Sequence, residues 1–225
     1  MQALLIAISL AATSVETYPT PELASAALVT QVQTGTLLFS EGECLAVKAF
    51  TGSRYTHVAT VVVADDQPIV YDSQNGVGVR KLPLSDYLAA MQPEELHVLQ
   101  PSRPFSEKRT ALLVEALEQE LGRPYGVSHH LTGDRAAGLH CAEYATDALI
   151  AAKVVKAEHP PRVSPASLRR GLLRHELYVE EASIVIAAEE PTRPPGRNTC
   201  HELWLDTKDC CIGCWGGFYR RVMCR

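Results

Sequence analysis

Between residues 30 and 187, short apolar runs alternate with amphipathic segments, which indicates that strands and helices follow one another along the chain. The run THVATVVV (56–63) is rich in valine and threonine and continuously apolar. Such a run predicts a strand buried on both faces. Asn75-Gly76 predicts a hairpin turn. Further strands are predicted by GTLLFSEG (35–42), IVYDS (69–73), GVRKL (78–82), ELHVLQPS (95–102) and LYVEEASIVIAA (177–188).

Helical periodicity is clearest in residues 106–121, where Ser106 is a suitable N-cap and Gly122 and Pro124 end the pattern. Residues 141–155 predict a second helix, and residues 164–173, with Pro165 at the first helical position, a third. Shorter helices are predicted at 44–52 and 84–91. The core, about residues 30–187, is therefore expected to be α+β, with several antiparallel strands packed against a few helices.

The two ends of the chain differ from this core. Residues 1–25 are interpreted as a leader, because the apolar run 4–12 is typical of a secretory signal. No basic residue precedes Lys48, so the alternative is an N-terminal helix continuing through ELASAALVTQV (22–32), although the prolines of TYPTPE (17–22) interrupt it. Export to the periplasm or the cell exterior is expected, with a cytoplasmic location as the alternative. Residues 188–199 are proline-rich and linker-like, and residues 200–225 form a cysteine-rich tail.

Seven cysteines are present, and five of them lie between Cys200 and Cys224. Together with Cys44 these five would allow three disulfides, whose pairing the sequence does not determine. The alternative is zinc held by Cys211, Cys214 and neighbouring ligands. Disulfides are the preferred interpretation, because a single C-x-x-C is a weak zinc signal.

Composition and charge exclude two classes of protein. Hydrophobic residues make up 46% and charged residues 21% of the chain, which is ordinary for a globular protein. A net charge of −5 without a long Lys/Arg stripe argues against nucleic-acid binding. No run of about 20 apolar residues predicts a transmembrane helix.

Cys141 stands apart from the other cysteines, at the expected start of the second helix. A helix N-terminus stabilises a thiolate, so Cys141 is a candidate nucleophile. The alternative is a small apolar side chain in the core. Among the eight histidines, His57 at the start of the valine-rich strand is the leading candidate base. His140 is a poor candidate, because consecutive residues at a helix start project in different directions.

The motifs GTLLF, GSRYTHVATVV, IVYDS, GRPYG, HCAEYATDAL and SPASLRRG, in that order, resemble the permuted NlpC-type papain-like cysteine hydrolases of the YiiX/YebB kind. The resemblance covers about residues 33–180. It implies a circularly permuted papain-like fold, in which the histidine strand precedes the cysteine helix. It assigns the nucleophile to Cys141 in CAE and the base to His57 in SRYTHV.

The resemblance also places a third, orienting residue at Asp72, on the strand after the histidine strand. The expected register conflicts with this role. If ADDQP (64–68) is a five-residue loop, Val63 pairs with Ile69, and His57 shares a face with Tyr71 and Ser73 instead of Asp72. A bulge or a register shift of one residue would bring Asp72 to the same face.

The remaining expectations also follow from the resemblance. Tyr125 in GRPYG matches a recurrent position near the cleft, as a substrate contact or a packing residue. The expected reaction is acyl transfer through an acyl-enzyme, with neither metal nor cofactor. Substrates of such enzymes include cell-wall peptides and lipid-linked amides or thioesters, and the low aromatic content (6%) favours a peptide-type amide. The alternative is a non-catalytic secreted binding module on the same fold, with a disulfide-stapled tail.

Overall fold

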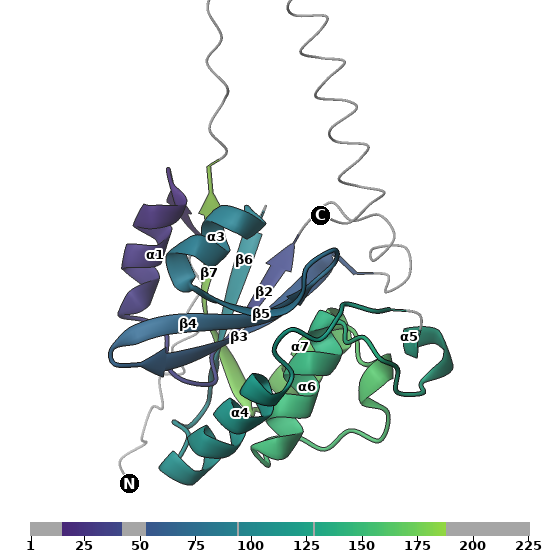
Figure 1. The fold of residues 1–225 in the computed structure, drawn as a ribbon. Helices are drawn as coiled ribbons and strands as arrows, with labels where there is room; N and C mark the ends of the chain where they lie inside the picture. Colours follow the sequence, from purple (N-terminus) through teal and green to yellow (C-terminus); the bar gives the residue numbers. More distant parts are fainter. Residues whose placement is uncertain (1–14, 42–52, 94, 128, 188–225) are drawn as a thin grey trace, which may run out of the picture.

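A seven-stranded sheet forms the centre of the computed structural model, which describes residues 15–41, 53–93, 95–127 and 129–187 (Figure 1). The strand order is β1-β7-β6-β2-β3-β4-β5. All neighbouring pairs are antiparallel except β1 and β7, which are parallel. The sheet is therefore mixed at one edge, where an antiparallel one was expected. The strands are β1 (Val15–Tyr18), β2 (Leu37–Glu41), β3 (Tyr55–Ala64), β4 (Gln67–Gln74), β5 (Gly78–Pro83), β6 (Glu95–Pro101) and β7 (Tyr178–Ile186).

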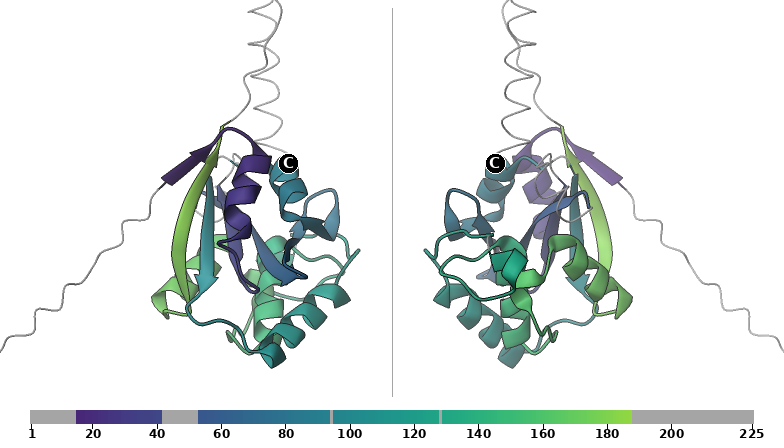
Figure 2. Two further views of the ribbon diagram at one scale, coloured as in Figure 1. Left: turned by 90° about the vertical axis from the view of Figure 1, so that its left-hand side faces the viewer. Right: turned by 90° about the vertical axis from the view of Figure 1, so that its right-hand side faces the viewer.

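Helices cover both faces of the sheet, α1 and α3 on one and α4, α6 and α7 on the other (Figures 1 and 2). The short helix α5 and a 3₁₀ turn at Pro160–Arg162 lie in the connections around α6. The α+β prediction is confirmed. The helices are α1 (Pro21–Val29), α3 (Leu84–Met91), α4 (Glu107–Gln119), α5 (His129–Thr132), α6 (Cys141–Ala151) and α7 (Pro165–Arg174).

Alternating side chains of β2 and β3 divide the core into two hydrophobic clusters. Phe39 and Val62 belong to the cluster under α4, α6 and α7, whereas their neighbours Leu38 and Val61 belong to the cluster under α1 and α3. All four side chains are nearly or fully buried. Each such residue contributes about 1.5–3 kcal/mol by leaving water. The prediction that the valine-rich strand is buried on both faces is confirmed.

The β3–β4 connection differs from its prediction. It is a tight turn whose central residues, Asp65 (φ 49°) and Asp66 (φ 60°), both lie in the left-handed region, and Ala64 pairs directly with Gln67. Aspartate tolerates this conformation, so the turn needs only two residues and the expected five-residue loop is wrong. Val63 consequently pairs with Pro68 instead of Ile69, a register shift of one residue.

The N-terminal boundary also differs from its prediction. Residues 15–25 were assigned to a leader, but β1 pairs with β7 and α1 packs against α3, so this part of the chain belongs to the folded unit. Pro21 does not interrupt a helix here. It occupies the first turn of α1, whose N-cap Thr20 accepts a hydrogen bond from the Leu23 N–H.

Several predictions concern segments outside the described residues. These are the apolar run 4–12, the helix at 44–52, the proline-rich linker 188–199 and the cysteine-rich tail 200–225. Within the described ranges, no helix has both the length and the apolar character needed to cross a membrane.

Candidate active site

Cys141 is the first residue of α6, as predicted, and its side chain is buried. Helix α6 packs against β3 and β4, the strands that carry His57 and Asp72. The backbone N–H groups of a first helical turn have no partner within the helix and create a positive potential there. The fold therefore places the thiol where an anion is stabilised.

Specific contacts hold the entry to α6 against the sheet. The buried Ser73 hydroxyl of β4 donates to the Leu139 carbonyl at 2.7 Å, and the Leu139 N–H donates to the Pro124 carbonyl at 2.9 Å. Gly138 lies so close to the preceding loop that a Cβ atom there would be 2.8 Å from the Gly126 nitrogen. The glycine is required for this close approach.

His57 and Asp72 interact directly across β3 and β4. His57 Nε2 lies 3.2 Å from Asp72 Oδ2 in a buried environment. Thr60 and Tyr71 are paired, so they share one face of the sheet; alternation then places both His57 and Asp72 on the other face. The register shift at the Asp65-Asp66 turn removes the conflict that the sequence predicted.

Arg80 and Tyr87 complete the surroundings of this pair. Arg80 pairs with Asp72 in the β4–β5 register and donates from Nε to Oδ1 at 2.8 Å and from Nη2 to Oδ2 at 3.3 Å. The ring of Tyr87, from α3, stacks on the His57 ring with 6.4 Å between centroids. Arg80 thus holds Asp72, and Tyr87 packs against the ring of His57.

The thiol and the imidazole shift each other's pKa in opposite directions. Burial alone would raise the pKa of Cys141, but the charge of His57 and hydrogen bonds from His140 and His57 lower it well below its usual range. Burial likewise disfavours charge on His57, but a Cys141 thiolate and the hydrogen bond to Asp72 raise the pKa of the imidazole. Both shifts favour a thiolate–imidazolium pair over the neutral pair.

His140, beside Cys141 in the sequence, has a structural role as the N-cap of α6. Its Nδ1 accepts from the Glu143 N–H at 3.3 Å, and its Nε2 lies 2.8 Å from the Pro161 carbonyl. The same carbonyl lies 2.8 Å from His130 Nδ1. A carbonyl can only accept, so Nε2 carries a proton and donates to Pro161. Burial disfavours charge on His140, but hydrogen bonding to Cys141 raises the pKa of its ring. His140 therefore caps α6 and supports the thiolate, and its two ring nitrogens are engaged in those contacts.

Tyr125 lies beside the thiol, where the resemblance placed it. It forms an isolated parallel bridge with Leu139 and is partly exposed. Burial and the negative charge of Cys141 raise the pKa of its phenol, so the hydroxyl stays protonated and can donate a hydrogen bond. Glu143, in the first turn of α6, is buried, and its carboxylate lies 3.6 Å from Arg135.

The structure thus brings Cys141, His57 and Asp72 together, with Tyr125 next to them. The sequence analysis missed Arg80 and Tyr87. The Asn75-Gly76 turn indicated that the two strands lie side by side, but a two-residue turn would place Val79 opposite Asp72. Arg80 is opposite Asp72 because three residues, 75–77, separate the paired Gln74 and Gly78. The sequence contained no comparable signal for Tyr87. This residue lies on α3, and no pattern in the sequence indicates that α3 packs beside His57.

Comparison with known proteins shows which family and which solved fold this chain is similar to. The sequence model of a family described as permuted papain-like amidase enzymes, YaeF/YiiX, C92 family, matches residues 31–162, which is more than half of the chain and includes the three residues above. Among solved structures, the crystal structure of metalloprotein yiiX from Escherichia coli O157:H7 is similar, with a TM-score of 0.47 and 22% identity. That alignment covers 69% of this chain and 89% of the other. No curated protein matches.

Proposed function

Because this chain belongs to the permuted papain-like amidases of the YaeF/YiiX, C92 family, we propose that it hydrolyses an amide bond with Cys141 as nucleophile and His57 as base. One observation carries this proposal: a buried thiol at a helix start interacts with a buried imidazole that is itself bonded to a carboxylate. A thiol is activated for nucleophilic attack when it lies beside a base that is itself oriented by a third group.

The proposed reaction begins with the proton of Cys141 on His57. The thiolate attacks the carbonyl carbon, and the developing oxyanion is held by the backbone N–H of Cys141 and a second donor. His57 then protonates the leaving amine as the C–N bond breaks, which leaves a thioester. A water molecule, deprotonated by His57, attacks that thioester and releases the carboxylic acid and the thiol.

Asp72 and Arg80 have the role of positioning residues in this scheme. Asp72 engages Nε2 of His57, so the other ring nitrogen, Nδ1, is the one available to Cys141. The two hydrogen bonds from Arg80 fix the carboxylate in that orientation and compensate its charge in the buried site. The imidazole is thereby held in one rotamer and one tautomer.

The substrate class proposed here is a peptide-type amide, with a cell-wall peptide as the first example to test. The amidase family supports the amide bond, and the low aromatic content (6%) supports a polar chain over a lipid. We also propose that the chain is exported, on the basis of the apolar run 4–12. An exported peptide amidase would have access to the peptides of the cell wall.

The test is turnover of a substrate panel by the full chain, with Cys141→Ala as the inactive control. The panel contains peptidoglycan-derived peptides, N-acyl lipid amides and acyl thioesters. Hydrolysis of the peptides, with a trapped thioester on Cys141, is the expected result. Preferential hydrolysis of the lipid amides would overturn the proposed substrate class but not the mechanism.

The alternative, a non-catalytic binding module, predicts a different outcome. Such a protein would hydrolyse no member of the panel, and its Cys141 would react with electrophiles no faster than an ordinary thiol. The coupled thiol and imidazole favour the enzyme, because a binding module has no need for an activated thiol.

A further inference from the structure

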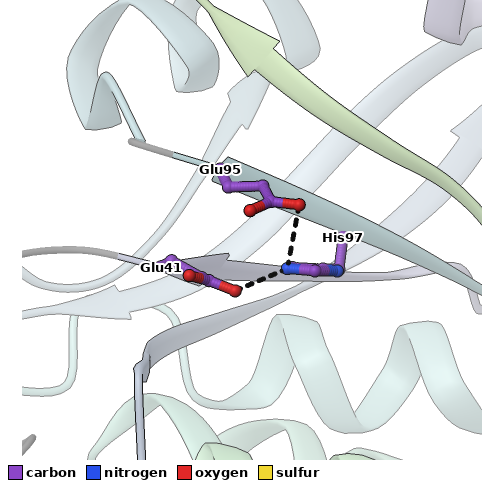
Figure 3. A group of neighbouring side chains, drawn as sticks. All are labelled: Glu41, Glu95 and His97. Atoms are coloured by element: carbon purple, nitrogen blue, oxygen red, sulfur yellow. Dashed lines mark hydrogen bonds and ion pairs between the residues drawn. The ribbon is translucent and has the colours of Figure 1, made fainter. Parts of the chain in front are cut away.

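A second cluster of ionisable side chains lies on β2 and β6 (Figure 3). Glu41 and Glu95 are directly opposite each other in the antiparallel register, and His97 lies two residues further along β6 on the same face. One donor atom from each of the three lies within 4.8 Å of the other two. His97 Nε2 is 2.7 Å from Glu41 Oε1 and 3.6 Å from Glu95 Oε1.

An outer layer of hydrogen bonds orients two of these three side chains. His97 Nδ1 lies 2.6 Å from Glu180 Oε1 on β7, and Arg169 in turn pairs with Glu180. The Ser183 hydroxyl donates to Glu95. A carboxylate on the far nitrogen of a histidine fixes the tautomer whose Nε2 lone pair points away from it. Here Nε2 is the nitrogen that faces Glu41 and Glu95, so it is the one that a metal held by the two carboxylates would meet.

Positive charge already compensates the two carboxylates, and that charge is exchangeable. Arg54 pairs with Glu41 and lies 3.5 Å from Glu95, but its side chain is 60% exposed. Arg54 thus supplies positive charge to both carboxylates from an exposed position, where a metal cation could replace it.

We propose that Glu41, Glu95 and His97 bind a divalent first-row transition metal, which displaces Arg54 from the two carboxylates. One imidazole and two carboxylates suit Zn²⁺, Mn²⁺ or Fe²⁺ better than the all-oxygen preference of Ca²⁺ or Mg²⁺. The three ligands come from β2 and β6, and Cys141 is not among them. A bound metal would cross-link these two strands and stabilise the folded chain by mass action.

The test uses Mn²⁺ as the probe on the full chain, with free Mn²⁺ followed by its electron paramagnetic resonance signal. Mn²⁺ prefers nitrogen and oxygen ligands, so it avoids Cys141 and the thiols of the tail. The wild-type chain should bind one Mn²⁺ saturably, and Glu95→Gln, which conserves volume, should weaken binding at least tenfold. Cys141→Ser should bind like the wild type, because the thiol is not a ligand.

Arg54→Gln distinguishes a metal site from a structural ion-pair network. Removal of the competing cation should tighten Mn²⁺ binding several-fold, whereas a purely structural arginine would leave it unchanged. Circular dichroism melting of each variant identifies any that fail to fold. His97→Gln should also weaken Mn²⁺ binding. If that variant fails to fold, Glu95→Gln and Arg54→Gln still decide whether the cluster binds metal. Non-saturable binding, or no response to either of these substitutions, would overturn the proposal.

Discussion

At the scale of single residues, the chemistry of Cys141 depends on its coupling to His57. The shifted pKa values define a pH window in which the thiol is deprotonated and the imidazole is protonated. The lower limit lies below the ordinary thiol value of about 8.5, and the upper limit lies above the ordinary imidazole value of about 6.5. Below the window the thiolate is lost by protonation, and above it the leaving group has no acid.

This coupling predicts the pH dependence of alkylation. Iodoacetamide should label Cys141 at pH 7 much faster than an ordinary thiol, because the lowered pKa leaves more thiolate. His57→Ala should move the midpoint of the labelling rate upward, towards about pH 8.5. Peptide mass spectrometry resolves Cys141 from the other cysteines, and the exposed His159, changed to alanine, is the control. Equal midpoints for wild type and His57→Ala would contradict the coupling.

The contacts of Asp72 predict two different defects in the proposed hydrolysis. Asp72→Asn should lower kcat/KM about a hundredfold or more and shift the high-pH limit downward, because His57 loses its anionic partner. Arg80→Gln should reduce kcat about tenfold without that downward shift, because the carboxylate keeps its charge and loses only its orientation.

The exposed pair of Arg135 and Asp147, which is also bidentate, provides the matched control. Arg135→Gln should leave both kcat and the pH profile unchanged. If Arg80→Gln shifted the high-pH limit as far as Asp72→Asn does, Arg80 would have more than a positioning role.

At the scale of elements, one turn determines whether Asp72 belongs to the site. The tight turn at Asp65-Asp66 sets the register of β3 against β4, and a difference of one residue would turn Asp72 to the other face. The contact between β4 and the start of α6 is equally specific, because it depends on the buried Ser73 hydroxyl. The site therefore depends on both the register of β3 against β4 and the contact between β4 and the start of α6.

Two serine substitutions separate stability from positioning. Ser73→Ala leaves the buried Leu139 carbonyl without that donor, which should cost about 1–3 kcal/mol and slow alkylation of Cys141 by loosening the start of α6. Ser164→Ala removes the capping box of α7 at a cost of about 1 kcal/mol and should leave Cys141 alkylation unchanged. Urea unfolding and the alkylation rate are the two measurements. Equal effects of both variants on alkylation would show that Ser73 acts only through global stability.

At the scale of the whole molecule, the segment 15–29 completes both the sheet and one face of the core. Strand β1 covers an edge of β7, and Leu28 of α1 is fully buried under the sheet. This segment is therefore a structural part of the domain, although its first residues follow the apolar run 4–12 closely enough to be interpreted with it as a leader.

Two leucines of α1 test this assignment. Leu28→Ala should lower the free energy of unfolding by about 2–5 kcal/mol, because it leaves a cavity in the core. Leu23, which is 52% exposed on the same helix, should change stability by less than about 0.5 kcal/mol when replaced by alanine. Chemical unfolding gives both values. An equally small effect of both substitutions would mean that α1 is not part of the stable core.

The sequence by itself determined the local elements and the kinds of chemistry. Continuous valines indicated the buried strand β3, Ser106 and Ser164 marked the starts of α4 and α7, and the order of motifs indicated the family. These features were predictable because they depend on residues a few positions apart.

Only the tertiary structure decided which distant side chains meet. It placed Asp72 on the face of His57, put Arg80 opposite Asp72, joined Glu41 to His97, and added β1 to the sheet. Each of these contacts joins strands, and strand register is set by the balance of turn geometry and burial over the whole sheet. The residues of one segment do not determine that balance, because it depends on all the strands and turns of the sheet. The pairing of distant strands is therefore known only from the folded structure.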